Sequence, residues 1–395
     1  MRATTGWAGL LACGLAVLAA GAPAQTIKVG LLNSTSGPFA SLGDQIDKSI
    51  KLYMKENAGK LPPGVKIELI VRDDGGPNPD KAKQLTQELI VRDKPDFLTG
   101  FIWTPNAMSV ATLLTESKTP LVIMNAAASV ITERSPYIVR ASFTLWGSGY
   151  YMGTWAAKKY KRAYTMVTDF TPGHDSEAAF IRGFTDGGGQ IIGSVRMPLK
   201  NPEYISFMQR AKDLKPDVIF NFVTAGATST AIMKAYGDLG LREAGIPFIG
   251  TGDAVTEEEL INMGDTPLGY ISAWHYSNAG NRPANKAFLS AWERDYGAAV
   301  PPGFIAMAAY DAMDMIYTAI REQKGRVDPD QTMKILSNYR NPNSPRGPFA
   351  IDPATRDIVH NIYIRETRKI GNRLFNVEIE TIPNVKDPWK EFVKK

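Results

Sequence analysis

The chain has 395 residues, of which 44% are hydrophobic and 22% are charged, and its formal net charge is +5. This composition excludes a disordered or collagen-like protein, and the length predicts two lobes rather than one core. The positive charges form no basic block with interleaved aromatic residues, which argues against a nucleic-acid partner, and the single cysteine excludes a disulfide scaffold and a thiolate metal cluster.

The first 24 residues have the pattern of a secretory signal peptide. Arg2 gives a positively charged start, the apolar run at 10–20 is too short to span a bilayer, and small residues at 22–24 form a cleavage site. Cys13 lies inside the apolar run, where it is removed with the signal or, in the alternative, carries a lipid. The sequence therefore predicts export to the periplasm and no transmembrane segment in the mature chain.

After the signal, short apolar segments alternate with amphipathic helical patterns. The predicted strands are 27–32, 65–71, 97–100, 120–124, 164–168, 218–223 and 248–250. Asn78 and Pro79 predict the start of one of the helices between them, with a cap residue followed by proline. This alternation indicates parallel sheets covered by helices on both faces, which is the α/β class.

The loops that follow these strands are the expected ligand site, because ligands of parallel sheets bind beyond the carboxyl ends of the strands. These loops are rich in small residues, hydroxyl groups and aromatic rings, and they contain few charges. This mixture favours a small, partly apolar ligand. Thr104 as a cap and Pro105 as the first helical residue would aim the amides of Asn106 and Ala107 at a ligand carboxylate, although a cap that contacts only its own helix is the alternative.

The sequence has no strong signature of catalysis or of a cofactor. The three histidines, His174, His275 and His360, lack the spacing of a zinc site, and no phosphate-binding loop or nucleophile elbow is present. The acidic run at 257–259 reads as the first turn of a helix capped by Thr256, not as a metal cluster. We therefore expect no enzyme activity, no metal and no cofactor.

The order of the motifs resembles that of leucine-binding-type periplasmic solute receptors, which serve ABC importers of branched-chain amino acids, aromatic acids and related molecules. The segments that carry the resemblance are 27–30 with 36–38 and Gly43, 72–74 with 78–79 and Ala82, 217–220, and 309–312. The resemblance covers nearly all of residues 26–365. It implies a type I periplasmic binding protein fold, in which two α/β lobes are joined by three crossovers near 142–146, 271–276 and 344–350.

The resemblance divides the chain into interleaved lobes. Residues 1–24 are the signal peptide, 25–142 plus 275–345 form lobe 1, and 143–274 plus 346–395 form lobe 2. The ligand is held between the lobes, and the membrane permease of an ABC transporter receives it. We expect the receptor to be a monomer.

The resemblance also implies a set of ligand-binding residues. Thr104 falls where the family has a serine that grips the ligand carboxylate, and residues 125–127 fall on its backbone-binding loop. The full predicted set is Phe39, Leu42, Trp103, Thr104, Asn125, Ala126, Ala127, Pro172, Gly173, Thr224, Asp253 and Trp274.

One departure from the family pattern concerns the ligand ammonium. Amino-acid receptors have a threonine at the position of Ala127, and their ammonium-binding acid falls near Gly252, next to Asp253. Because an unpaired buried ammonium is strongly unfavourable, the loss of this threonine favours a small carboxylate with an apolar or aromatic body. The alternatives are a branched-chain amino-acid receptor that uses Asp253 for the ammonium, and a periplasmic sensory subunit.

Overall fold

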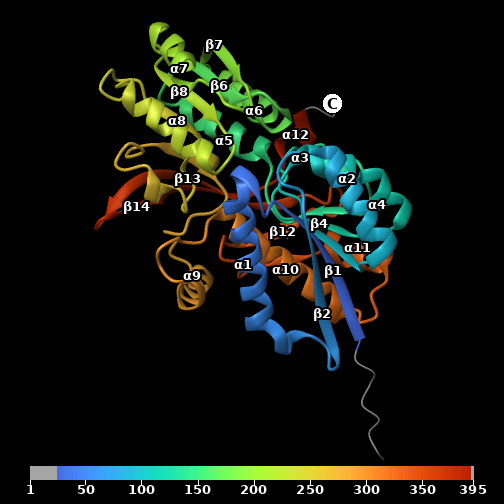
Figure 1. Cartoon of the computed structure of the whole chain (residues 1–395). Coiled ribbons are helices and arrows are strands. Elements are labelled where there is room, and N and C mark those ends of the chain that lie inside the picture. The colour runs from blue at the N-terminus through green and yellow to red at the C-terminus, as the bar shows by residue number, and fades with distance from the viewer. Residues whose placement is uncertain (1–24, 393–395) are drawn as a thin grey trace, which may run out of the picture.

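Two β-sheets, each covered by helices, form two lobes that meet at the loops following their parallel strands (Figure 1). The computed structural model describes residues 25–392, so the predicted signal peptide at 1–24 and Cys13 lie outside the described residues. Within the described part, no helix has the length and apolar character needed to cross a membrane. The fold is the α/β type that the strand and helix pattern predicts.

The first sheet contains five parallel strands in the order β2-β1-β3-β4-β5. They are β1 (Gln25–Asn33), β2 (Val65–Asp73), β3 (Phe97–Gly100), β4 (Leu121–Ile123) and β5 (Ile138–Arg140). Strands β3, β4 and β5 are buried along their whole length, and β3 and β4 were predicted as short apolar runs, whereas β5, which ends in Arg140, was not predicted. The elements α1 (Ala40–Asn57), α2 (Pro79–Glu88), α3 (Thr104–Ser109) and α4 (Ala111–Ser117) connect them.

The second sheet begins with five parallel strands and ends with an antiparallel addition that the sequence did not predict. The parallel strands are β6 (Arg162–Thr168), β7 (Gln190–Met197), β8 (Val218–Phe222), β9 (Phe248–Thr251) and β10 (Ile271–Trp274). The antiparallel strands are β11 (Arg340–Asn341), β12 (Phe349–Ile351), β13 (Ile358–Ile370) and β14 (Arg373–Val385). The helices α5 (Leu145–Ala157), α6 (Thr171–Asp186), α7 (Tyr204–Asp213) and α8 (Ala227–Asp238) belong to this sheet.

The chain passes between the two sheets more than once. It leaves the first sheet after β5, and after β10 it returns as α9 (Pro283–Tyr296), α10 (Phe304–Glu322) and α11 (Pro329–Ser337). Helices α9 and α10 pack on α1, so the orange helices lie among the blue elements in Figure 1. The predicted boundary between 345 and 346 falls inside the β11–β12 hairpin, both strands of which belong to the second sheet.

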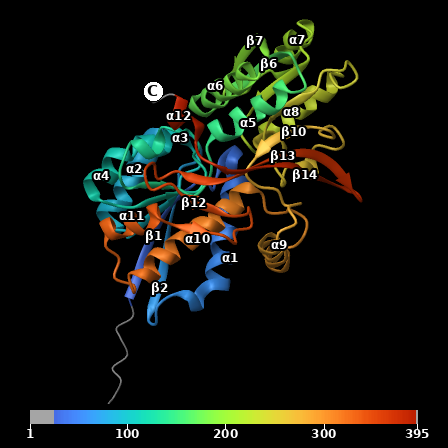
Figure 2. The same ribbon diagram turned by 180° about the vertical axis from the view of Figure 1, so that it is seen from behind.

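Strand β13 joins the antiparallel strands of the second sheet to its parallel strands. Its residues 358–360 pair with β12, its residues 363–366 pair with β10, and β14 runs along its other edge. Figure 2 shows these long red strands crossing the middle of the molecule. These pairings extend the second sheet beyond its parallel strands.

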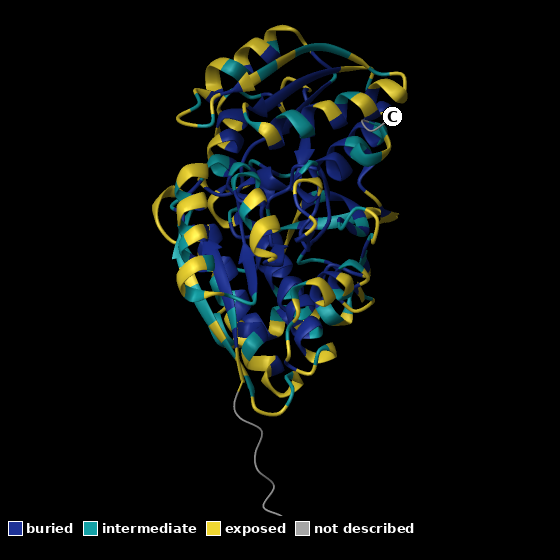
Figure 3. Ribbon diagram, turned by 90° about the vertical axis from the view of Figure 1, so that its right-hand side faces the viewer, coloured by how far each residue is buried: buried dark blue, intermediate teal, exposed yellow. Residues whose placement is uncertain are grey.

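Buried arginines satisfy the backbone carbonyl groups near the crossovers. Arg140 donates to the carbonyl oxygens of Ala126 (2.6 Å) and Ala128 (2.7 Å) and pairs with Asp357 at 2.5 Å. Arg346 donates to the carbonyl oxygens of residues 141 and 142 and pairs with Asp311. Both arginines lie in the buried interior, drawn dark blue in Figure 3, where carbonyl groups have no water to bond.

Candidate ligand-binding site

A small, partly open cavity lies where loops from the two sheets meet. The loops after β3, β4 and β5 supply one wall, and the ends of β6, β8 and β9 supply the other. The lining residues are Leu42, Ile102, Trp103, Thr104, Asn125, Ala127, Phe143, Leu145, Phe170, Pro172, Phe222, Thr224, Ala225, Asp253 and Phe304. The cavity thus occupies the position that parallel-sheet proteins use for ligands.

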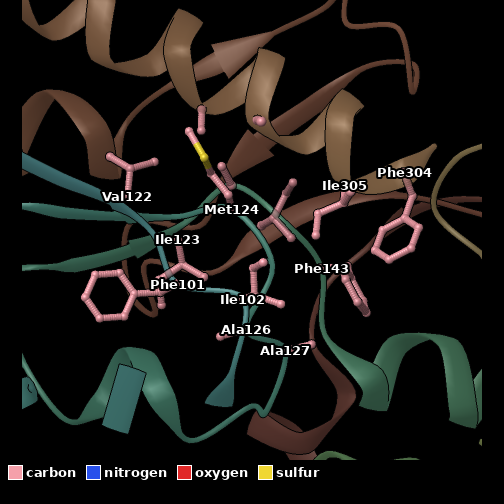
Figure 4. Close-up of a cluster of buried hydrophobic side chains, with 14 of the residues drawn as sticks. Phe101, Ile102, Val122, Ile123, Met124, Ala126, Ala127, Phe143, Phe304 and Ile305 are labelled. Atoms are coloured by element: carbon pink, nitrogen blue, oxygen red, sulfur yellow. The ribbon is translucent and has the colours of Figure 1, made fainter. Parts of the chain in front are cut away.

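The walls of the cavity are largely apolar and rich in aromatic rings. The rings belong to Trp103, Phe143, Phe170, Phe222 and Phe304. Phe143 and Phe304 lie edge to face with centroids 5.8 Å apart, and Figure 4 shows both near Ile102 and Ala127. Among the described residues that line the cavity, none is lysine, arginine or histidine. These walls fit a small ligand with a flat apolar body whose polar groups are bound by neutral donors.

Eight of the twelve predicted residues line this cavity. They are Leu42, Trp103, Thr104, Asn125, Ala127, Pro172, Thr224 and Asp253. The structure brings them together from segments up to about 200 residues apart in the sequence. Their role in binding a ligand stays a prediction.

The other four predicted residues do not line the cavity. Phe39 packs edge-on against Trp103 with centroids 4.5 Å apart, and Trp274 is fully buried against Phe143 and Phe304. Ala126 is buried, and its amide donates to the carbonyl of Phe101. Gly173 is needed for packing, because a Cβ there would lie 1.9 Å from the carbonyl oxygen of Thr168. These residues support the lining from behind.

Seven lining residues were not predicted as ligand-binding residues. They are Ile102, Phe143, Leu145, Phe170, Phe222, Ala225 and Phe304. Most lie within one or two residues of a predicted position, at the ends of predicted strands. Phe304 comes from the start of α10, far along the chain, and Pro301-Pro302-Gly303 before it was the available signal of a helix start.

The start of α3 differs from the prediction. The cap residue is Trp103, whose carbonyl accepts the amide of Ala107 at 3.0 Å, and Thr104 is the first helical residue. The amide of Ala107 is therefore used inside the helix and does not serve a ligand. The Thr104 hydroxyl oxygen accepts only a long bond, 3.4 Å, from the amide of Ala128, which leaves its proton free to donate.

Asn125 adds an unused acceptor to the same wall. Its Nδ2 donates to the carbonyl of Ile102 at 2.9 Å, whereas its Oδ1 is buried without a partner within residues 25–392. An orphaned buried acceptor is rare in folded proteins. The wall formed by Thr104 and Asn125 therefore has spare capacity for hydrogen bonds to a bound molecule.

Phe101 holds a strained backbone next to this wall. It is fully buried and has a φ of 57°, a left-handed conformation that side chains other than glycine rarely adopt. Its amide bonds the carbonyl of Leu32 and its carbonyl accepts the amide of Ala126, which fixes this conformation. The bend turns residues 102–104 from the end of β3 into the cavity wall, as is common where strain is kept at a functional site.

Asp253 is the one ionisable residue among the described residues that line the cavity. It follows β9, is 7% exposed, and accepts a hydrogen bond from the Thr251 hydroxyl at 2.9 Å. Burial raises the pKa of Asp253 to about 7, although the Thr251 bond and the charge of Arg365 oppose the rise. This carboxyl is thus poised between its neutral and charged forms near pH 7.

The acidic run at 257–259 is not the first turn of an α-helix, contrary to the prediction. It forms a turn before a short 3-10 helix, Leu260–Asn262, and two of its three acids are buried. Glu257 pairs with Arg365 at 3.1 Å. Glu258 has no hydrogen-bond partner for either carboxyl oxygen among the described residues, and it lies against Gly303, where a Cβ would be 2.1 Å from its Oε2.

Replacing Glu258 by glutamine should flatten the pH dependence of folding stability. Burial raises the pKa of Glu258 to about 8, well above the value of about 4.3 for an exposed glutamate. Between these values the folded chain holds a proton that the unfolded chain releases, so stability falls as pH rises, by at most about 1.4 kcal/mol per pH unit. We expect the Tm of the Glu258→Gln variant to decline less than that of the wild type between pH 5 and 8.

Glu259→Gln is the matched control for this measurement. Its carboxylate accepts hydrogen bonds from Thr230 (3.1 Å) and Asn262 (3.2 Å), so this variant makes the same change of side chain on the same turn at an acid that has partners. Equal slopes for the wild type and Glu258→Gln would show that Glu258 does not take up a proton on folding.

Comparisons with known proteins place this cavity in context. The model of the family described as periplasmic binding protein matches residues 26–372. The Leu/Ile/Val-binding protein homolog 6 of Brucella melitensis is 37% identical over 94% of this chain and 95% of its own length.

Two solved structures of ABC transporter solute-binding proteins are also similar. One, from Rhodopseudomonas palustris BisB5 in complex with 3,4-dihydroxybenzoic acid, has 44% identity and a TM-score of 0.89, and the match covers 92% of this chain and 99% of that chain. Another, from R. palustris in complex with 4-hydroxybenzoate, has 40% identity and a TM-score of 0.89, with 94% of this chain and 100% of that chain covered.

Proposed function

Because this chain belongs to the periplasmic binding protein family, we propose that it captures a small aromatic carboxylate between its two lobes and delivers it to the permease of an ABC transporter. The observation that carries this proposal is the cavity, which five aromatic rings line and in which no described lining residue is cationic. The similar solute-binding proteins from R. palustris, which bind hydroxylated benzoates, support the same ligand class. The receptor would work in the periplasm as a monomer.

The Thr104 hydroxyl of the first-lobe wall would bind the ligand carboxylate. The Thr104 hydroxyl has a proton to donate, and hydrogen bonds to a charged acceptor are about twice as strong as those between neutral groups. The aromatic rings would enclose the ligand body. Both lobes contribute lining residues. A ligand that binds the closed arrangement of the lobes more tightly than the open one shifts the protein toward the closed arrangement.

A branched-chain amino acid is the second candidate ligand, and the Brucella relative named a Leu/Ile/Val-binding protein homolog favours it. In this case Asp253 would provide the counter-charge for the ammonium. The absence of a side-chain hydroxyl at Ala127 weakens this candidate, because an ammonium has three protons to place.

Isothermal titration calorimetry of the purified protein with 4-hydroxybenzoate, benzoate and leucine tests the proposal. We expect saturable binding of the aromatic acids and none of leucine. At about one hundred times the Kd, a bound acid should also stabilise the protein by about 2.7 kcal/mol, seen as a rise in Tm. Binding of leucine without binding of either aromatic acid would overturn the proposal in favour of the second candidate.

A further inference from the structure

We propose that Asp253 is a specificity-determining residue that selects aromatic acids with a ring hydroxyl, by accepting a hydrogen bond from that hydroxyl. This inference rests on the proposed function and deepens it. It assigns one end of the ligand to the first lobe, where Thr104 and Asn125 lie, and the other end to the second lobe, where Asp253 follows β9.

The Asp253 carboxyl lines the cavity with few hydrogen-bond partners, namely the Thr251 hydroxyl and its own backbone amide. Thr251 donates to its Oδ2, but no cationic side chain within residues 25–392 donates a hydrogen bond to it. Arg365, the cation whose charge it feels, donates instead to Glu257 and to the hydroxyl of Ser272, both at 3.1 Å. A buried carboxyl with so few partners is costly unless something else in the cavity donates to it.

The surroundings of Asp253 determine the kind of donor that fits. The walls around Asp253 are apolar apart from Thr224, whose hydroxyl is already bonded to that of Thr228 at 2.9 Å. An ammonium would need two further acceptors at this end. A ring hydroxyl has one proton, needs one acceptor, and leaves the rest of the ring in contact with apolar side chains, so it matches this end of the cavity.

Selectivity for a ring hydroxyl follows from this arrangement. A site built to hydrogen-bond a hydroxyl discriminates against the analogue that lacks it, because the buried polar group of the protein is then left unpaired. Asp253 takes up a proton near pH 7, and this limits the penalty, because burying the neutral acid costs less free energy than burying the carboxylate. We therefore expect a preference of about tenfold to a hundredfold for 4-hydroxybenzoate over benzoate, not the larger ratios of a site with a fixed charge.

The test is the ratio of Kd values for benzoate and 4-hydroxybenzoate in the wild type, Asp253→Ala and Asp253→Asn. In Asp253→Ala we expect the ratio to fall to about 1. Asp253→Asn keeps an acceptor oxygen and nearly the same shape, so it should retain part of the preference. Benzoate binding by each variant also shows that the variant is folded.

Two controls sharpen this test. 4-Fluorobenzoate fills similar space to 4-hydroxybenzoate but has no proton to donate, so the wild type should bind it with about the same Kd as benzoate. Asp238→Ala removes an exposed acid at the end of α8 that pairs with Lys234, and its ratio should equal that of the wild type.

The outcomes separate the inference from the proposed function. If the wild type binds neither aromatic acid, the proposed function fails. If it binds both but Asp253→Ala keeps the wild-type ratio, or if the wild type shows no preference, the role of Asp253 is overturned and the proposed function stands. If the wild type binds leucine and Asp253→Ala does not, the Asp253 carboxyl binds an ammonium and not a ring hydroxyl.

Discussion

The Asp357→Asn variant is expected to lose about 3 to 5 kcal/mol of unfolding free energy, because it leaves Arg140 buried without its counter-charge. Arg140 is fully buried, and its Nε lies 2.5 Å from Asp357 Oδ1. The other carboxylate oxygen accepts from Thr132 at 2.9 Å and lies 3.3 Å from Lys390. Asparagine keeps the shape of this side chain but removes the charge that two cations share.

Equilibrium unfolding in urea, followed by tryptophan fluorescence, measures this loss. The matched control is Asp186→Asn, which removes the partner of Arg182 in an exposed pair on α6 and should change the free energy by less than about 1 kcal/mol. A loss below 1 kcal/mol for Asp357→Asn would mean that the Arg140 charge is compensated elsewhere.

The Thr104→Val variant should bind 4-hydroxybenzoate about tenfold to a hundredfold more weakly than the wild type. Valine has nearly the same size as threonine, but it has no proton to donate to the ligand carboxylate, and a hydrogen bond to a charged group contributes about 1.5 to 3 kcal/mol. The amide of Ala128 also loses its acceptor. Calorimetric titration at one salt concentration and one pH measures the change.

Thr185→Val is the control for this binding measurement. Thr185 is exposed on α6, and its hydroxyl bonds only backbone carbonyls of its own helix, so its removal should leave the Kd unchanged. If Thr104→Val binds 4-hydroxybenzoate as tightly as the wild type does, the carboxylate is held elsewhere in the cavity. The preference for 4-hydroxybenzoate over benzoate should persist in Thr104→Val, because both acids carry the carboxylate.

Seven of the ten parallel strands could be predicted from local pattern, whereas the parallel strands β5, β7 and β10 and the antiparallel strands were not predicted. Strands such as β3 and β8 are buried on both faces and read as short apolar runs between turns. Strand β13 contains Arg365 in a fully buried position, because Glu257, 108 residues away, pairs with it. A pattern of hydrophobicity cannot reveal a buried arginine whose partner is so distant in the sequence.

The candidate site was predictable in its loops but not in its individual side chains. The loop after β6 was identified, yet Phe170 and Pro172 line the cavity while Gly173 packs against the end of the strand. Trp274 lies at the end of β10, and its burial behind Phe143 depends on how the two sheets approach each other. Tertiary packing decides which of two neighbouring residues faces the cavity and which faces the core.

The passage of the chain between the sheets has a consequence for how the protein folds. The hydroxyl of Ser49 on α1 bonds the carbonyl of Ala306 on α10, a contact between residues 257 positions apart. The core of the first sheet therefore closes only after about three quarters of the chain is available. Such high contact order slows folding and keeps the early segments from folding as a unit during synthesis. A chain of this kind remains open for longer than one built from consecutive units, because its first sheet must wait for helices that come late in the sequence.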